Sequence, residues 1–158
     1  MKTELAETTN LPLAALREQL SARVIVPSDA DYETARVVMP GIIDRHPAVI
    51  VRVAKAADVA LAIAFARTNG LEIAVRSGGH SIHGTTDGGL VIDLRDMKAL
   101  EIDPAAGTCW AETGLTAAEL TVAAWEHGLA IGFGDTGSVG IGGITLGGVS
   151  ATWCASTA

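Results

Sequence analysis

The chain is poor in the residue types that several classes of protein require. Its two cysteines, Cys109 and Cys154, fit neither a metal-ligand spacing nor a disulfide framework. Aromatic residues make up only 4% of the 158 residues and the formal net charge is −7, which argues against a nucleic-acid-binding surface. No apolar run reaches the length of a membrane span, and residues 1–7 contain no apolar signal core. We therefore expect a cytoplasmic protein with no membrane, nucleic-acid or metal partner.

Apolar residues and glycine, in contrast, are abundant. Hydrophobic residues make up 49% of the chain, which is enough for the core of one domain or of a large fragment of one. Many of the 18 glycines lie in two stretches, residues 76–84 and 137–148. Glycine lets the backbone turn sharply and approach a ligand closely, so these stretches are the candidate sites of function.

Helical spacing of apolar residues appears in three segments. The predicted helices are residues 11–22, 56–68 and 116–127. The last of these begins with a capping box made by Thr116 and Glu119. Gly70 and Gly128 follow the second and third helices, in the position where glycine commonly ends a helix.

Strands are predicted where apolar or β-branched residues run together or alternate. They are residues 48–53, 71–75 and 90–94, and a hairpin formed by residues 100–103 and 108–112. Residues 24–47 are interrupted by prolines and a glycine, and we expect them to be irregular. The order strand, helix, strand places the residues after 71–75 where an α/β unit meets its ligand.

The first glycine stretch, residues 76–81, reads Arg-Ser-Gly-Gly-His-Ser and follows the predicted strand 71–75. Gly78 and Gly79 allow successive N–H groups to point at an anion. Arg76 adds a planar set of donors for a phosphate. His80 is a nucleophile or proton-transfer group at the edge of this turn. A phosphate-binding loop is the function that this stretch predicts.

The second stretch, residues 137–148, is predicted to be another loop of phosphate size. Its glycines alternate with apolar residues, whereas flexible linkers are polar. Two such loops suggest a cofactor with a diphosphate. Residues 132–137 also match G-x-G-x-x-G, but we discount a dinucleotide fold because no helical pattern opens after them and no acidic residue follows inside a complete unit.

Several motifs occur in the order and spacing of a known family. They are residues 76–81, 87–94 and 139–148, together with an opening segment at residues 39–47. These motifs closely resemble the N-terminal FAD-binding part of the berberine-bridge-enzyme-like oxidoreductases, which belong to the vanillyl-alcohol-oxidase, or PCMH-type, flavoproteins. The resemblance runs from about residue 28 to residue 148.

The resemblance implies an α+β fold, with a PCMH-type FAD-binding domain of two α+β subdomains and the cofactor between them. We expect residues 1–27 to form an N-terminal helix and lead-in, and residues 28–148 to form this domain with its second subdomain incomplete.

The resemblance also implies which residues bind FAD, with the loop 76–81 around the diphosphate. The expected FAD-binding residues are Arg76, Ser77, Gly78, Gly79, His80, Ser81, Gly84, Thr136, Gly137, Ser138, Gly140, Gly142, Gly143, Leu146 and Gly147. In many members the histidine at the position of His80 is bonded to the flavin 8α-methyl carbon, and a single covalent link through His80 is expected here. Some members add a second link through a cysteine, but Thr136 occupies that position and excludes it.

The resemblance implies an FAD-dependent oxidoreductase that accepts hydride from a small organic substrate, with O₂ as a possible acceptor of the electrons. The catalytic residues lie outside the resemblance, and we expect this chain alone to lack a substrate domain and activity. Two alternatives stay open: a stand-alone flavin- or phosphate-binding module, and a non-functional truncated remnant.

The chain departs from the family after Gly148. With GC-rich codons, residues 149–158 can be read one base out of phase as GLGHLVRKHG, which is close to how the family would continue. We hypothesise that residues 149–158 are an out-of-frame tail, and a genuine short variant is the alternative.

The remaining polar and aromatic residues have simpler interpretations. We expect His83 to be a solvated loop residue. The large aromatic residues Trp110, Trp125 and Phe133 are predicted to lie in the core, and the acidic residues Asp93, Asp96 and Asp103 to be turn and strand-edge charges.

Overall fold

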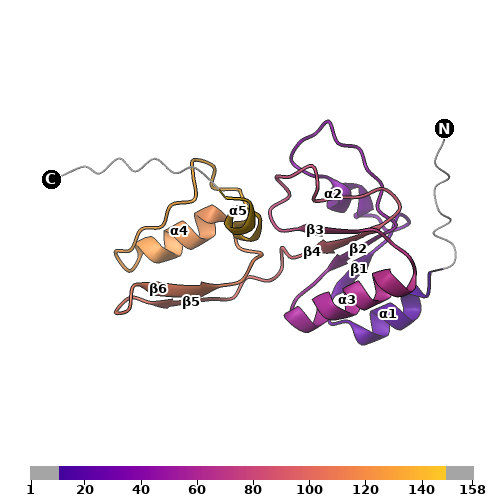
Figure 1. Ribbon diagram of the computed structural model, residues 1–158, viewed down its shortest axis with the longest axis horizontal. Coiled ribbons are helices and arrows are strands. Elements are labelled where there is room, and N and C mark those ends of the chain that lie inside the picture. The colour runs from indigo at the N-terminus through magenta and orange to yellow at the C-terminus, as the bar shows by residue number, and fades with distance from the viewer. Residues whose placement is uncertain (1–10, 149–158) are drawn as a thin grey trace.

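The computed structural model describes residues 11–148 and shows two lobes side by side (Figure 1). The first lobe contains α1 (Leu13–Gln19), β1 (Arg23–Ile25), α2 (Tyr32–Arg36), β2 (Val49–Arg52), α3 (Ala56–Thr68), β3 (Ile73–Arg76) and β4 (Leu90–Asp93). The second lobe contains β5 (Leu100–Asp103), β6 (Thr108–Ala111), α4 (Ala117–Trp125) and α5 (Ile141–Gly147). The predicted α+β fold with two subdomains is confirmed.

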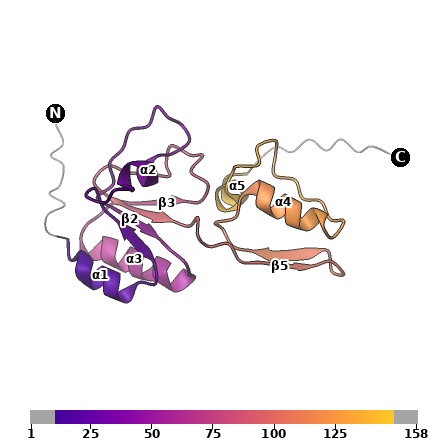
Figure 2. The ribbon, with the colours of Figure 1, turned by 180° about the vertical axis from the view of Figure 1, so that it is seen from behind.

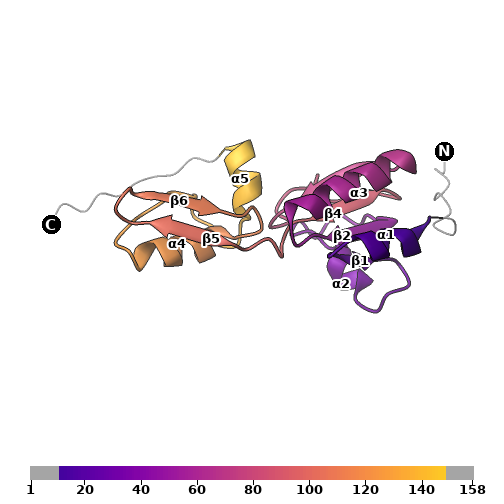
Figure 3. The ribbon, with the colours of Figure 1, turned by 90° about the horizontal axis from the view of Figure 1, so that it is seen from below.

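The first lobe is a four-stranded sheet in the order β1-β2-β4-β3, covered by helices on both faces. Strands β2 and β3 run parallel to β4, and β1 is antiparallel to β2. Helices α1 and α3 lie on one face and α2 on the other, as Figures 1 and 3 show. Because both faces are covered, β2 and β4 are buried and read as continuous apolar runs.

The second lobe pairs β5 with β6 in an antiparallel hairpin, which α4 crosses on one side (Figure 2). Its core is small and consists of Leu115, Leu120 and Ile141. Leu100, Ala111, Phe133 and Ile144 pack against this core while staying partly exposed. The apolar core of this lobe therefore depends on α5 as much as on the hairpin.

The structure corrects three predictions of local structure. Residues 24–47 are not wholly irregular, because they contain part of β1 and all of α2. The first helix stops at Gln19, since Leu20 is already extended and leads into β1. Residues 141–147 form α5 rather than a loop, and a helix therefore does follow the G-x-G-x-x-G match.

The burial of three side chains also differs from the prediction. Trp110 and Trp125 are 59% and 76% exposed, so they are not core residues. Phe133 is partly buried against the core of the second lobe, as expected. Asp93 is completely buried in the first lobe and is not a strand-edge charge. His83 is exposed, which confirms its assignment to a solvated loop.

The predicted capping box of α4 is confirmed. Thr116 Oγ1 accepts a hydrogen bond from the Glu119 N–H, and the Glu119 carboxylate accepts one from the Thr116 N–H at 2.7 Å. We expect Thr116→Ala to lower the free energy of unfolding by about 1 kcal/mol in urea denaturation, because the first turn of α4 loses its side-chain acceptor. Thr121→Ala, an exposed change on the same helix, is the control. Equal losses in both variants would contradict the assignment.

Residues 11–148 include no helix that is long and apolar enough to cross a membrane. The predicted out-of-frame tail, residues 149–158, lies outside the described residues, as do residues 1–10 of the predicted N-terminal helix and lead-in.

Candidate functional site

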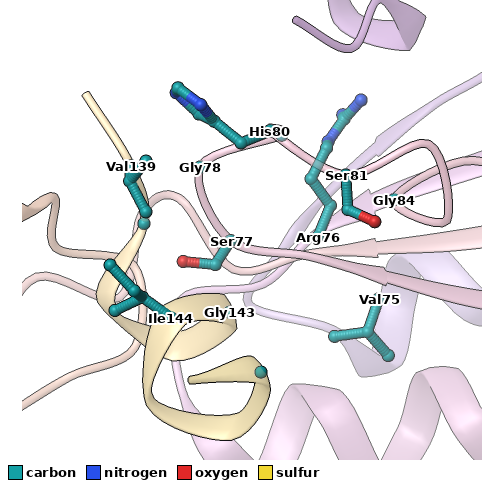
Figure 4. A pocket seen from close by; sticks show the side chains of 13 residues that line it. Val75, Arg76, Ser77, Gly78, His80, Ser81, Gly84, Val139, Gly143 and Ile144 are labelled. Carbon is teal, nitrogen blue, oxygen red and sulfur yellow. The ribbon is translucent and has the colours of Figure 1, made fainter. Parts of the chain in front are cut away.

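A pocket of about 440 Å³ lies between the two lobes, where β3 ends and α5 begins. Its first wall is the loop 76–81, which carries Arg76 at its start and His80 at its turn (Figure 4). Its second wall is formed by residues 139–147 of the other lobe. The lining residues are Val75, Arg76, Ser77, Gly78, Gly79, His80, Ser81, Gly84, Val139, Gly140, Gly143, Ile144 and Gly147. The structure thus brings both glycine stretches to one site.

Two glycines from different lobes meet backbone to backbone at the base of this site. A Cβ placed on Gly78 would overlap the backbone nitrogen of Gly140, and a Cβ on Gly140 would overlap the backbone nitrogen of Gly78 and the hydroxyl of Ser77. Neither glycine has a positive φ. Glycine is therefore required here by the close approach of the two chains and not by backbone conformation.

Hydrogen bonds hold the two lobes together around this contact. Ser77 Oγ donates to the carbonyl of Thr113 at 2.5 Å, and Ser138 Oγ lies 3.0 Å from Nε2 of His80. Figure 4 shows the Ser77 side chain directed toward the α5 segment. Within the second lobe, the Ile141 N–H donates to the carbonyl of Leu115 at 2.9 Å, which anchors the start of α5. These contacts fix the separation between the two walls of the pocket.

The turn of the first loop is anchored from its outer side. Gly79 has a φ of 77°, a conformation that favours glycine, and its carbonyl accepts a hydrogen bond from the Met39 N–H at 2.8 Å. The predicted opening segment 39–47 thus contacts the phosphate-type loop directly. Sequence reasoning gave no reason to place these two segments together.

Arg76 has a structural role that was not predicted. It is 2% exposed, and its Nη2 donates to Asp93 at 2.8 Å and to the carbonyl of Ala35 at 2.6 Å, while Nη1 donates to the carbonyl of Val37 at 3.3 Å. The guanidinium therefore ties β3 to β4 and to the end of α2. These bonds use Nη1 and Nη2, whereas the buried Nε has no partner in the part of the chain that the structure describes, and Arg76 lines the pocket, so its predicted contact with a phosphate stays a prediction.

Asp93 is buried and is surrounded by three arginines, of which only Arg76 is buried as well. Arg95 Nη2 lies 2.8 Å from its carboxylate, and Arg52 Nε lies 3.7 Å from it. Burial alone would raise the pKa of Asp93, but the hydrogen bonds from Arg95 and the charge of Arg76 outweigh burial and lower it. Arg52 also lies 4.0 Å from Asp96, so three arginines face two carboxylates and leave an excess of positive charge near the start of the loop 76–81. Such a field favours an anionic ligand in the pocket.

Five predicted site residues do not line the pocket: Thr136, Gly137, Ser138, Gly142 and Leu146. Gly137 and Gly142 pack instead against Ala118 and Thr113, where a Cβ would come within 3.0 Å of those side chains. Leu146 is 93% exposed. Ser138 stays connected to the site through His80.

Three apolar residues, Val75, Val139 and Ile144, line the pocket and were not predicted as site residues. Val75 ends a strand that was predicted to be buried, but it is 56% exposed, so its position at the pocket could be read from the sequence only in part. An apolar wall beside a backbone cradle suits a ligand with a flat ring system and a phosphate-bearing tail.

The residues present fit FAD. The pocket combines two glycine stretches that leave room for a ligand at the backbone, an apolar wall, and a neighbouring excess of positive charge. When bound, FAD supplies a ring system that accepts hydride. The protein contributes the cradle and an imidazole, His80, at its edge.

Comparison with known proteins agrees with this fit. Residues 47–157 match the family described as FAD binding domain. (R)-6-hydroxynicotine oxidase of Paenarthrobacter nicotinovorans is 37% identical over 131 residues, which are 82% of this chain and 29% of that protein. Among curated proteins, the uncharacterised FAD-linked oxidoreductase YvdP of Bacillus subtilis is 36% identical, over 82% of this chain and 30% of its own length.

Solved structures give the same result. BBE-like 1 of Physcomitrella patens matches with a TM-score of 0.77 and 30% identity, over 85% of this chain and 30% of that one. This chain therefore spans less than a third of the length of each of these three relatives. The resemblance seen in the sequence motifs is confirmed: the chain belongs to the FAD binding domain family, and it corresponds to the FAD-binding part of berberine-bridge-enzyme-like FAD-linked oxidoreductases.

Proposed function

We propose that the chain is the N-terminal part of a flavin-dependent oxidoreductase that oxidises a small organic substrate by hydride transfer to FAD, with O₂ as the electron acceptor. The single observation that carries the cofactor part of this proposal is the pocket between the lobes, where Gly78 and Gly140 touch. The name of one relative, (R)-6-hydroxynicotine oxidase, supports a small-molecule substrate and an oxidase reaction. This chain spans less than a third of each of the three relatives, and we place the substrate-binding residues outside it.

In this proposal the loop 76–81 binds the diphosphate through its backbone. Ser77, Gly78 and Gly79 present main-chain N–H groups, and Ser81 adds a hydroxyl at the far end of the turn. Arg76 holds the loop in place from below through Asp93, and its charge favours the anion at a distance. On the opposite wall, nothing lies within 4 Å of a Cβ position on Gly143, which leaves space there for the cofactor.

His80 is proposed to form the covalent link to FAD. It lines the pocket, and it is only half-buried, so a cofactor in the pocket can reach its ring. Neutral imidazole is a competent nucleophile. The link would keep the cofactor bound through every turnover.

The experiment is the replacement of His80 with alanine. After incubation with FAD, the wild-type chain is expected to retain yellow flavin through acid precipitation, with the mass of one flavin added. His80→Ala is expected to release all of its flavin under acid while still binding FAD reversibly, since the diphosphate contacts come from the backbone. The measurements are the absorbance of the precipitate and the intact mass.

His83→Ala, which replaces an exposed histidine three residues further along the chain, is the matched control and should keep the covalent flavin. Complete release of flavin by the wild type would contradict the covalent link. Failure of the wild type to quench the fluorescence of added FAD would contradict the whole proposed site.

A further inference from the structure

His80 has one ring nitrogen engaged and one free. Its Nε2 lies 3.0 Å from Ser138 Oγ, a side chain that comes from the other lobe. Within residues 11–148, the structure contains no hydrogen bond to Nδ1 of His80. The two nitrogens therefore differ in their surroundings, and only one of them is open to a new bond.

Ser138 is held in position by the first turn of α4. The Ala117 N–H donates to the carbonyl of Val139 at 2.8 Å, and the Ala118 N–H donates to the carbonyl of Gly137 at 2.9 Å. These are N–H groups at the start of a helix, which have no partner within the helix itself. Because the residues on both sides of Ser138 are fixed by α4, its hydroxyl is presented to His80 from a rigid support.

The hydrogen bond can be made with either tautomer of His80, and the two tautomers differ in what they leave at Nδ1. If Ser138 donated to Nε2, the ring proton would sit on Nδ1 and neither nitrogen would have a free lone pair. If the Nε2–H donates to Ser138 Oγ, the lone pair of Nδ1 is free and the exposed hydroxyl can turn its own hydrogen to solvent. Only the second arrangement gives a ring that can act as a nucleophile.

We propose that Ser138 is a positioning residue for the covalent attachment of FAD: it accepts the hydrogen bond from Nε2–H of His80 and leaves Nδ1 as the attacking nitrogen. This inference rests on the proposed function of His80. The new bond joins Nδ1 to the carbon of the flavin 8α-methyl group. The methyl group loses one hydrogen and Nε2 releases its proton, and the two electrons and two protons pass to O₂, which becomes H₂O₂.

The proposal extends the function of the second glycine stretch. Ser138 and Gly140 are two residues apart, so the segment that closes the lobes against Gly78 also orients His80. The orientation of the imidazole therefore depends on a contact between the two lobes.

The test compares Ser138→Ala and Ser138→Thr in the full chain, with FAD added as the probe. We expect Ser138→Ala to slow covalent attachment by about 10- to 100-fold, the loss typical of a misplaced reacting group, while the Kd for FAD before attachment stays within about threefold. Ser138→Thr keeps a hydroxyl and is expected to attach flavin at close to the wild-type rate. Thr145→Ala, which removes an exposed hydroxyl from α5, controls for the loss of a hydroxyl nearby.

A second readout does not depend on attachment. In the chain without FAD, nitrogen-15 NMR of the His80 ring is expected to show a protonated Nε2 and a bare Nδ1, and Ser138→Ala is expected to make the two signals approach each other as the tautomers mix. A proton on Nδ1 in the wild type would overturn the proposal, as would wild-type attachment rates in Ser138→Ala or slow attachment in Ser138→Thr. The wild type could attach no flavin and still carry its ring proton on Nε2, with Ser138→Ala removing this preference. That result would contradict the proposed covalent link through His80 but would support the proposed orientation of the ring by Ser138.

Discussion

Replacing Gly140 with alanine is expected to raise the Kd for FAD by about 10- to 100-fold. The added Cβ would overlap the backbone of Gly78 and the hydroxyl of Ser77, so the lobes must move apart to admit it. Overpacking of a tight contact costs about 1–3 kcal/mol, and each 1.4 kcal/mol is a factor of ten in affinity. Quenching of FAD fluorescence during titration measures the change.

Gly78→Ala places a methyl group in the same contact from the other lobe and should have a similar effect. Gly41→Ala is the matched control, because nothing lies within 4 Å of a Cβ at Gly41 and its φ is ordinary. Normal FAD binding by both Gly78→Ala and Gly140→Ala would show that the contact between the lobes does not shape the cofactor site.

Replacing Asp93 with alanine is expected to lower the free energy of unfolding by about 3–5 kcal/mol, as is typical when one partner of a buried ion pair is removed. The carboxylate is completely buried and receives Arg76 at 2.8 Å and Arg95 at 2.8 Å. Without it, the guanidinium of Arg76 stays buried with no counter-charge. Urea denaturation of the chain at pH 7 measures the loss.

Asp96→Ala is the control, because its side chain is 53% exposed and 4.0 Å from Arg52, and exposed pairs contribute about 0–1 kcal/mol. A loss for Asp93→Ala no larger than for Asp96→Ala would contradict the assigned role.

The same cluster predicts a dependence of stability on pH. The pKa of Asp93 is lowered in the folded chain, because its hydrogen bonds to arginine outweigh burial. Its contribution is therefore complete above the unfolded pKa, about 3.9, and is lost as the pH falls below that value through the lowered folded pKa. Asp93→Ala should lack this part of the acid-induced loss of stability.

Local sequence was sufficient for the elements with strong patterns. The helix predicted at residues 56–68 matches α3, and the capping box at Thr116 starts α4 as expected. The apolar runs around residues 49–52 and 90–93 are β2 and β4, since strands covered on both faces have no polar alternation.

Other elements exist only because of long-range contacts. Strand β1 has three residues and is defined by its pairing with β2, which is distant in sequence. Helix α5 contains three glycines, which are poor helix formers, and it is stabilised by the contact of Ile141 with the core of the second lobe. Neither could be read from local propensity.

The sequence by itself indicated a phosphate-binding loop with a histidine beside it. Glycine pairs let the backbone approach a ligand closely, and the histidine adds a nucleophile. Only the tertiary structure decided the partners. A guanidinium such as that of Arg76 can bind a phosphate or a carboxylate equally well, and the burial of Asp93 beside it selected the carboxylate. In the same way, the pairing of His80 with Ser138 joins residues 58 positions apart. Such contacts depend on how the two lobes pack, and local patterns carry no record of that packing.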